Sequence, residues 1–203
     1  MRHPIILAVC MAGVTALAGC GEKDANATVE RAFKDVNVVD ETNLSDVMLT
    51  VADPNEAVSY FARSVKESPD RIDHQRGLAA SLVRAKRSTE AVGAWDKVTK
   101  MKGATPEDSV QLADALIRSG NWARAETVLN SIPPTHETFA RYRLEAMVAD
   151  SKEQWSRADS FYEIAVGLTT TPAAVMNNWG YSKLTRGDYP EAERLFGEAD
   201  RKN

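Results

Sequence analysis

Residues 176–199 read MNNWGYSKLTRGDYPEAERLFGEA, and this stretch decides the fold. Gly180 lies in its first half, a Gly-Asp turn signal stands at 187–188, and Ala192 and Phe196 lie in its second half. The spacing predicts two helices joined by a turn. Small residues let two helices approach closely, and the large residue four positions after the alanine fills the gap between them. The residues of the second helix that we expect to pack inward are Tyr189, Phe196 and Ala199.

The same pattern recurs along the chain at a period of about 34 residues. Five alanines follow one another at spacings of 34, 34, 33 and 34: Ala57, Ala91, Ala125, Ala158 and Ala192. A large apolar residue stands four positions after each: Phe61, Trp95, Leu129, Tyr162 and Phe196. A small residue stands twelve positions before each: Ser45, Ala79, Ala113, Ala146 and Gly180. One helix pair of this length cannot bury its apolar face alone, so the sequence predicts a stack of repeats.

Signals for helix ends fall where this period requires them. Asp53 and Glu56 flank a proline in the order of an N-cap, a first-turn proline and a capping-box glutamate, and residues 105–108 repeat this order. We expect Asp188 and Glu191 to begin the last helix in a similar way. Further prolines lie between repeats, where the preceding helix must end: Pro69, Pro106, Pro133, Pro134 and Pro172. The sequence therefore predicts an all-α fold, an α-solenoid of about ten helices.

This pattern resembles the tetratricopeptide repeat (TPR), which implies about five helix-turn-helix repeats over residues 39–203. The last repeat shows the resemblance best, and the first repeat is the weakest because Ser45 and Ser64 depart from it. The tryptophan that the family usually has early in the first helix of each repeat is absent. Its place is taken by Glu41, Gln75, Ser109, Tyr142 and Met176.

The composition narrows the class of protein further. The chain has 203 residues, with 25 Lys plus Arg against 29 Asp plus Glu, and a formal net charge of −4. A non-specific nucleic-acid binder needs a clear surplus of cations, so we expect no nucleic acid among the partners. Two cysteines and three histidines are too few for a zinc ribbon or a disulfide framework.

The N-terminal segment has the features of a bacterial export signal. Met1-Arg2-His3 is followed by the uncharged run 4–18, which at about 15 residues is too short to span a bilayer of roughly 30 Å. Leu17-Ala18-Gly19-Cys20 resembles the lipobox of bacterial lipoproteins. The resemblance implies a signal peptide over 1–19 and a covalent lipid on Cys20, the one cofactor-like group that we expect.

Family analogy also predicts where the processed chain is held. Gly21 is not the aspartate that retains many lipoproteins at the inner membrane, which favours the periplasmic face of the outer membrane. The processed chain has 184 residues, a net charge of −5 and no free thiol. Residues 20–38 are polar and read as a lipidated tether, with a docked N-terminal helix as the alternative. An ordinary signal peptide that happens to precede a cysteine is the alternative to the lipobox.

The residues that could carry out catalysis or bind a metal are sparse. After processing the only histidines are His74 and His136, and neither stands in a metal-binding or hydrolase motif. The four tryptophans fall at positions that we expect to be packed in the core. We therefore predict a protein that is not an enzyme and has no catalytic residue, no metal and no small-molecule substrate.

The TPR resemblance implies a concave surface lined by the first helix of each repeat. The positions that face it in the family correspond, in the last two repeats, to Ala140, Arg143, Met147, Asp150, Ser151, Ala174, Asn177, Tyr181, Leu184 and Thr185. Across all repeats the candidate partner-binding residues are Arg76, Arg84, Arg118, Arg143, Asn177 and Tyr181. Guanidinium groups suit a peptide that carries carboxylates. The alternative is that these arginines pair internally with Asp73, Asp114 and Asp150.

The lipobox, the chain length and the closing segment 177–189 together resemble the TadD family of TPR lipoproteins from the Tad (tight adherence, Flp) pilus machinery. The resemblance implies a pilotin-like role, in which the lipoprotein holds an outer-membrane secretin subunit during assembly. The alternatives are a TPR lipoprotein of β-barrel outer-membrane protein assembly or of type IV pilus biogenesis, and an adaptor for cell-wall hydrolases. All are membrane-anchored scaffolds that bind a protein client.

Overall fold

A computed structural model of the chain describes residues 43–202. The predicted signal peptide (1–19), Cys20, the tether (20–38) and the solenoid residues 39–42 and 203 lie outside the described residues. From Ser45 on, the chain forms one compact unit.

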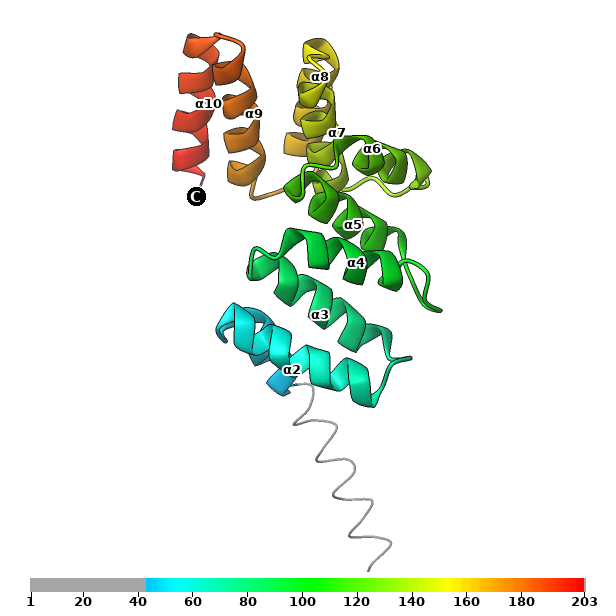
Figure 1. Cartoon of the computed structure of the whole chain (residues 1–203). Coiled ribbons are helices and arrows are strands. Elements are labelled where there is room, and N and C mark those ends of the chain that lie inside the picture. The colour runs from blue at the N-terminus through cyan, green and yellow to red at the C-terminus, as the bar shows by residue number, and fades with distance from the viewer. Residues whose placement is uncertain (1–42, 203) are drawn as a thin grey trace, which may run out of the picture. The chain divides into compact units, whose positions relative to one another are not determined.

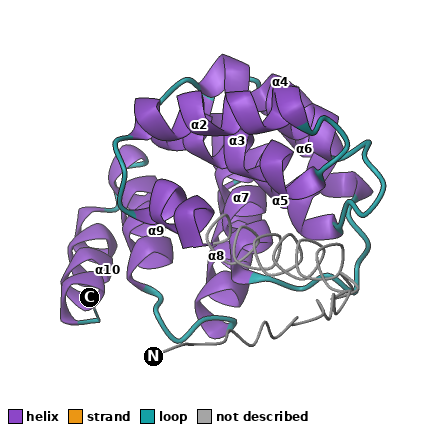
Figure 2. Ribbon diagram, turned by 90° about the horizontal axis from the view of Figure 1, so that it is seen from below, coloured by secondary structure: helices purple, strands orange, loops and turns teal. Residues whose placement is uncertain are grey.

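The residues from 43 to 202 form helices joined by loops, and none of them forms a strand (Figure 2). A helical stretch at 43–50 comes first. Helices that follow one another in the sequence pack side by side (Figure 1). The labelled helices are α2 (Pro54–Glu67), α3 (Ile72–Arg84), α4 (Ser88–Val98), α5 (Pro106–Arg118), α6 (Trp122–Ser131), α7 (Phe139–Ser151), α8 (Trp155–Gly167), α9 (Ala173–Thr185) and α10 (Tyr189–Arg201). The predicted all-α solenoid of helix pairs is confirmed.

The helix starts follow two of the three predicted signals. The Asp53 side chain accepts hydrogen bonds from the backbone N–H of Asn55 and Glu56 and so caps α2. The Thr105 backbone N–H donates to Asp108 Oδ2 at 2.7 Å, which closes the capping box of α5. The prediction for α10 was wrong, because the side chain of its N-cap residue Asp188 makes no capping hydrogen bond.

The 34-residue pattern marks the contacts between helices. All five repeat alanines are buried, and so are four of the five large residues that follow them. Phe196, the fifth, is half-buried, and its ring lies where a Cβ on Gly180 would come within 2.8 Å of it. The small residue of α9 and the large residue of α10 therefore fit together as the spacing predicted.

A second close approach escaped the sequence pattern. A Cβ added to Gly77 in α3 would lie 2.3 Å from the ring of Phe61 in α2. Real Cβ atoms do not come so near to other heavy atoms, so only glycine fits at this crossing. The repeat pattern places its small residue at Ala79, two positions later, and therefore did not predict the close contact at Gly77.

The core consists of two clusters that meet in α7. The first runs through α2 to α7 and includes Leu116 and Leu144, and the second joins α7, α8 and α9 around Tyr162. Helix α7 also contacts α5 and α9, so the first helices of the last three repeats lie next to one another. These helices carry the candidate site.

Two aromatic residues lie nearer the solvent than predicted. Tyr189 was expected to pack inward but is 66% exposed, and Trp122 was expected in the core but is 36% exposed. Each is the first residue of its helix, α10 or α6, next to the turn that joins the two helices of a repeat. Within residues 43–202, no helix is both long and apolar enough to cross a membrane.

Candidate binding surface on the first helices

Arg76 in α3 is bound across the boundary between two repeats. Its Nε and Nη2 each donate to a carboxylate oxygen of Asp108 in α5 at 2.8 Å, and Nη2 also donates to the Gly103 carbonyl at 3.1 Å. Asp73 lies 3.5 Å from Nη1. Burial alone would raise the pKa of Asp108, but hydrogen bonds from Arg76 and Thr105 hold that pKa below its ordinary value. The guanidinium therefore links α3 to α5.

Arg84, at the end of α3, binds backbone instead of a carboxylate. Its two terminal nitrogens donate to the carbonyls of Met48 and Ala52 at 2.8 and 2.9 Å. Carbonyls at the end of a helix have no partner within the helix, so a guanidinium placed there satisfies them. Arg84 thus joins the end of the 43–50 stretch to α3.

Arg118 and Arg143 share one carboxylate. Arg118 Nε lies 2.5 Å from Asp114 Oδ2, and Arg143 Nη2 lies 3.4 Å from Asp114 Oδ1. Because a guanidinium has five N–H donors, both side chains keep donors for a ligand. The two guanidinium groups and the one carboxylate together carry a net charge of +1.

The four predicted arginines therefore all have partners within the chain. Arg76, Arg118 and Arg143 form ion pairs of the kind that the internal-pairing alternative predicts. Asp73 and Asp114 are partners that the sequence predicted, and Asp108 is a partner that it did not predict. Their role in binding a partner stays a prediction.

Tyr181 and Asn177 both lie on the exposed side of α9. Tyr181 is 65% exposed and lines a cavity, whereas Asn177 is exposed but is not part of its lining. The neighbouring Asn178 amide is in the lining, and its Nδ2 lies 3.4 Å from Met147 Sδ in α7.

The cavity has a volume of about 290 Å³ and is formed by four helices. Its lining is mostly apolar, with aromatic rings from α6, α8 and α9 and a single carboxylate. Five lining residues stand at positions that the TPR resemblance places on the concave surface: Met147, Asp150, Ser151, Tyr181 and Thr185.

Asp150 is the carboxylate of this cavity. Tyr162 Oη donates to its Oδ2 at 2.9 Å, and Ser182 Oγ donates to its Oδ1 at 2.8 Å. Burial raises the pKa of Asp150 above its ordinary value, although both hydrogen bonds act against that rise. Within the described part of the chain Asp150 forms no ion pair, so two neutral hydroxyls are its partners.

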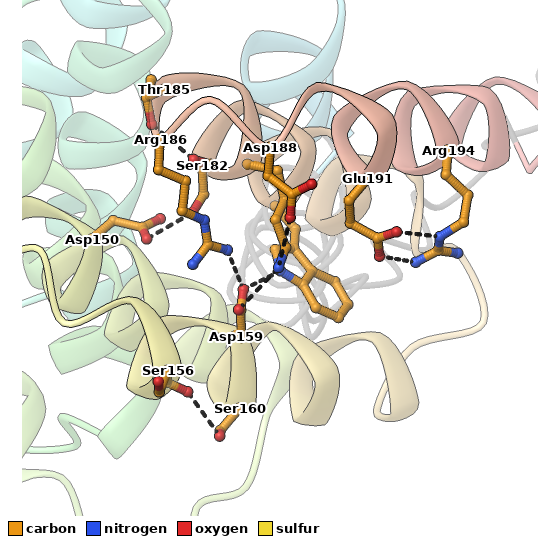
Figure 3. A network of polar contacts seen from close by, with 12 residues as sticks. Asp150, Ser156, Asp159, Ser160, Ser182, Thr185, Arg186, Asp188, Glu191 and Arg194 are labelled. Carbon is orange, nitrogen blue, oxygen red and sulfur yellow. Dashed lines mark hydrogen bonds and ion pairs between the residues drawn. The ribbon is translucent and has the colours of Figure 1, made fainter.

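Lys183 in α9 and Arg186, the residue that follows α9, are held by another carboxylate. Asp159 in α8 binds the Arg186 guanidinium (Figure 3). Trp179 Nε1 at 2.6 Å and Lys183 Nζ at 3.0 Å donate to the same carboxylate. Burial alone would raise the pKa of Asp159, but these hydrogen bonds hold that pKa below its ordinary value. The cluster fixes α9 against α8.

The same cluster orients two aromatic rings of the cavity region. The Trp179 ring stacks on Tyr162 with centroids 6.0 Å apart and an angle of 18° between the planes. The Arg186 guanidinium lies 5.5 Å from the centroid of Trp155, at the start of α8. These contacts hold Tyr162 and Trp155 in place, and Tyr162 in turn orients Asp150.

Sequence reasoning missed the part of the cavity that Trp122 and Trp155 contribute. Both were assigned to the core, but both line the cavity. A signal was present, because Trp122, Trp155 and Tyr189 stand at one repeat position, three residues before a repeat alanine. That position opens the second helix of each pair, where the chain has just left the turn.

Residues 43–202 contain no group of three or more His, Cys, Asp or Glu side chains that could hold a metal ion. His136 Nε2 lies 3.3 Å from Glu107, and His74 Nδ1 lies 3.1 Å from the Ser64 carbonyl.

Comparison with known proteins supports the fold alone. No protein-family model and no curated protein matches the chain. Among solved structures, MamA 41-end from Desulfovibrio magneticus RS-1 is 19% identical, with a TM-score of 0.62 over 79% of this chain and 91% of that one.

Two further structures are described as TPR proteins. TTC0263 from Thermus thermophilus is 15% identical, with a TM-score of 0.68 over 79% of this chain and 88% of that one. YrrB, described as having an unusual peptide-binding site, is 13% identical, with a TM-score of 0.56 over 77% of this chain and 81% of that one. With its helix pairs, its 34-residue period and these neighbours, the chain has the fold of a TPR solenoid.

Proposed function

We propose that this chain is a scaffold that holds a protein client on the surface formed by its first helices. The observation that carries the proposal is the cavity between α6, α7, α8 and α9, which combines aromatic walls with a carboxylate that forms no ion pair within residues 43–202. Binding sites for protein segments have this composition, with apolar pockets for anchor side chains and a few polar groups that set orientation. A TPR solenoid is suited to such protein–protein interaction.

We further propose that the scaffold is anchored to the periplasmic face of the outer membrane by lipid on Cys20. The support is the lipobox-like run Leu17-Ala18-Gly19-Cys20 after an uncharged segment. Stable anchoring takes more than one acyl chain, and a lipoprotein N-terminus supplies several. The polar residues 20–38 then tether the solenoid and raise the effective concentration of a bound client near the membrane.

The client that we propose is the secretin of a Tad (Flp) pilus or a related type II secretion system. The support is the resemblance to the TadD lipoproteins in the lipobox, the chain length and the closing segment 177–189. A pilotin must bind its secretin subunit before the multimer inserts, and a membrane-tethered groove meets that need.

The experiment follows secretin assembly in cells. A strain that lacks this chain should accumulate secretin monomer, and the wild-type chain should restore the multimer on a non-denaturing gel. Cys20→Ser, which removes the predicted lipid site, should fail to restore it and should leave the outer-membrane fraction. Normal multimer assembly in the deletion strain would rule out the pilotin role.

A photo-crosslinking residue in place of Tyr181 identifies the client directly. Because Tyr181 is exposed and lines the cavity, a crosslinker there should capture the secretin. The same crosslinker at Tyr189, which is equally exposed but outside the lining, is the matched control. Capture of a β-barrel assembly subunit or a cell-wall hydrolase by the Tyr181 position alone would replace the secretin with that client.

A further inference from the structure

Asp150 forms no ion pair within the described part of the chain, although the charge of Arg186 acts to lower its pKa. Lys183 in α9 and Arg186 directly after it bind Asp159, while Arg143 in α7 binds Asp114. Tyr162 and Ser182 each use one hydrogen bond on Asp150, and a carboxylate can accept about four. Asp150 therefore keeps acceptor positions for a cationic group that enters the cavity.

The walls around Asp150 suit a cation that has an apolar stem. Trp122, Trp155 and Tyr181 present aromatic rings, and Met147 adds a thioether. Aromatic rings attract ammonium and guanidinium groups, and an apolar wall accommodates the methylene stem of a lysine or arginine. A volume of about 290 Å³ lies at the lower end of ligand pockets, which fits one long side chain.

We infer that the cavity is a specificity pocket for a lysine or arginine side chain, flanked by apolar residues, in the protein client. This inference rests on the proposed function, because it names the chemistry that the client presents to the scaffold. It differs from the acidic peptide expected from the sequence. The four arginines behind that expectation have internal partners, whereas Asp150 forms no ion pair with any residue from 43 to 202.

The binding mode assigns a separate task to each part of the pocket. The ammonium or guanidinium group pairs with Asp150 at one end, and the stem lies against Trp122 and Met147. The ring of Tyr181 covers the stem from the exposed side of α9. Removing the carboxylate and the cation from water costs free energy, and the charge-assisted hydrogen bonds between them offset that cost.

The test uses capped hexapeptides, acetylated and amidated so that their ends carry no charge. In each pool one central position is fixed as Lys, Arg, norleucine or Glu, and binding is followed by tryptophan fluorescence. Pools with Lys or Arg should bind at least tenfold more tightly than pools with norleucine, which keeps the stem but removes the charge. Asp150→Asn should abolish this difference, so that Lys and norleucine peptides bind equally.

Two control variants, Glu163→Gln and Tyr189→Ala, separate binding in the pocket from the general attraction of cations to an acidic protein. Glu163→Gln removes one exposed negative charge of α8 outside the lining and should keep the tenfold preference. Tyr181→Ala should weaken the binding of the Lys and the norleucine peptides, whereas Tyr189→Ala should leave the binding of both unchanged. The norleucine comparison on the unaltered chain needs no variant, so the test does not depend on how well Asp150→Asn folds.

The possible results decide the inference and the proposed function separately. A preference for Glu pools, equal binding of Lys and norleucine pools, or a lysine preference that survives Asp150→Asn would overturn the basic specificity. If the secretin is still captured at the Tyr181 position, the scaffold function stands without this specificity. If the lysine preference depends on Asp150 but no secretin is captured, the pocket stands and the proposed client is wrong.

Discussion

At the scale of single residues, Asp108 and Asp150 both lie on the first helix of a repeat, but their surroundings affect the charged carboxylate in opposite ways. Asp108 is 3% exposed and is held by a guanidinium and a backbone N–H, so its charged form is favoured. Asp150 is held by two hydroxyls, and burial disfavours its charge. The first forms a structural ion pair, and the second is the carboxylate that we propose to bind a cationic side chain.

Arg76→Ala should destabilise the fold because it leaves Asp108 buried without its cation. We expect a loss of about 2–3 kcal/mol in the free energy of unfolding at pH 7, below the range for fully buried pairs because Arg76 is partly exposed. Urea unfolding followed by circular dichroism measures it. Arg87→Ala, which breaks the exposed pair with Glu90, is the control and should leave the midpoint nearly unchanged.

The effect of Arg76→Ala should also depend on pH. The pKa of Asp108 is depressed in the folded chain, so its contribution is present above the unfolded pKa and is lost as the pH falls through the folded one. The difference between the two proteins should therefore shrink as the pH falls below about 4. A difference that stays constant from pH 7 to pH 3 would contradict the assigned ion pair.

Asp150→Asn should increase the stability of the fold at pH 7, whereas Arg76→Ala should decrease it. Burial raises the pKa of Asp150, so its ionisation lowers stability as the pH rises from the unfolded pKa through the folded one. Asparagine keeps the shape without the charge, and the melting temperature at pH 7 should therefore rise. Near pH 3, where the native carboxyl is protonated, the two proteins should melt together. A variant that melts lower at pH 7 would show that the charged form is stabilised by its surroundings.

At the scale of helices, the 34-residue period predicted which residues meet a neighbouring helix and failed at the turns. The repeat alanines and four of the five large residues after them are core positions because they face a partner helix. Trp122 and Tyr189 begin their helices, where the neighbour is the turn, and no periodic rule buries them. The sequence did not predict the cavity, because side chains from four helices line it. The periodic pattern describes the faces of single helices and does not give the positions of four helices relative to one another.

Helix crossings supply a prediction that pairs two glycines. Gly77→Ala should destabilise the chain by about 1–3 kcal/mol, because the new methyl would overlap the Phe61 ring in a packed core. Gly93 in α4 has nothing within 4 Å of its Cβ position, so Gly93→Ala should stabilise it by about 0.5–1 kcal/mol through helix propensity. Chemical denaturation of both variants measures the difference. Equal effects would mean that α2 and α3 can separate to admit the methyl group.

At the scale of the whole described unit, the two core clusters share only α7. Each helix packs mainly against its neighbours in the sequence, and long-distance contacts between the two ends are not part of either cluster. In such a stack, stability is roughly a sum of repeat terms and nearest-neighbour interfaces. The binding cavity borders α7 and α9, so its integrity depends on the second cluster more than on the first.

This arrangement predicts that damage stays local. Ala91→Trp in α4 and Ala158→Trp in α8 place the same overlarge side chain at the same repeat position, at sites that are fully buried. Hydrogen exchange should show that Ala91→Trp lowers amide protection in α3 to α5 and spares α9 and α10, because the two regions share no core cluster. Ala158→Trp should lower protection in α7 to α9 and spare α3, and it should also remove peptide binding. If either variant exposes all helices together in one cooperative step, the stack folds as a single unit and the cavity depends on every repeat.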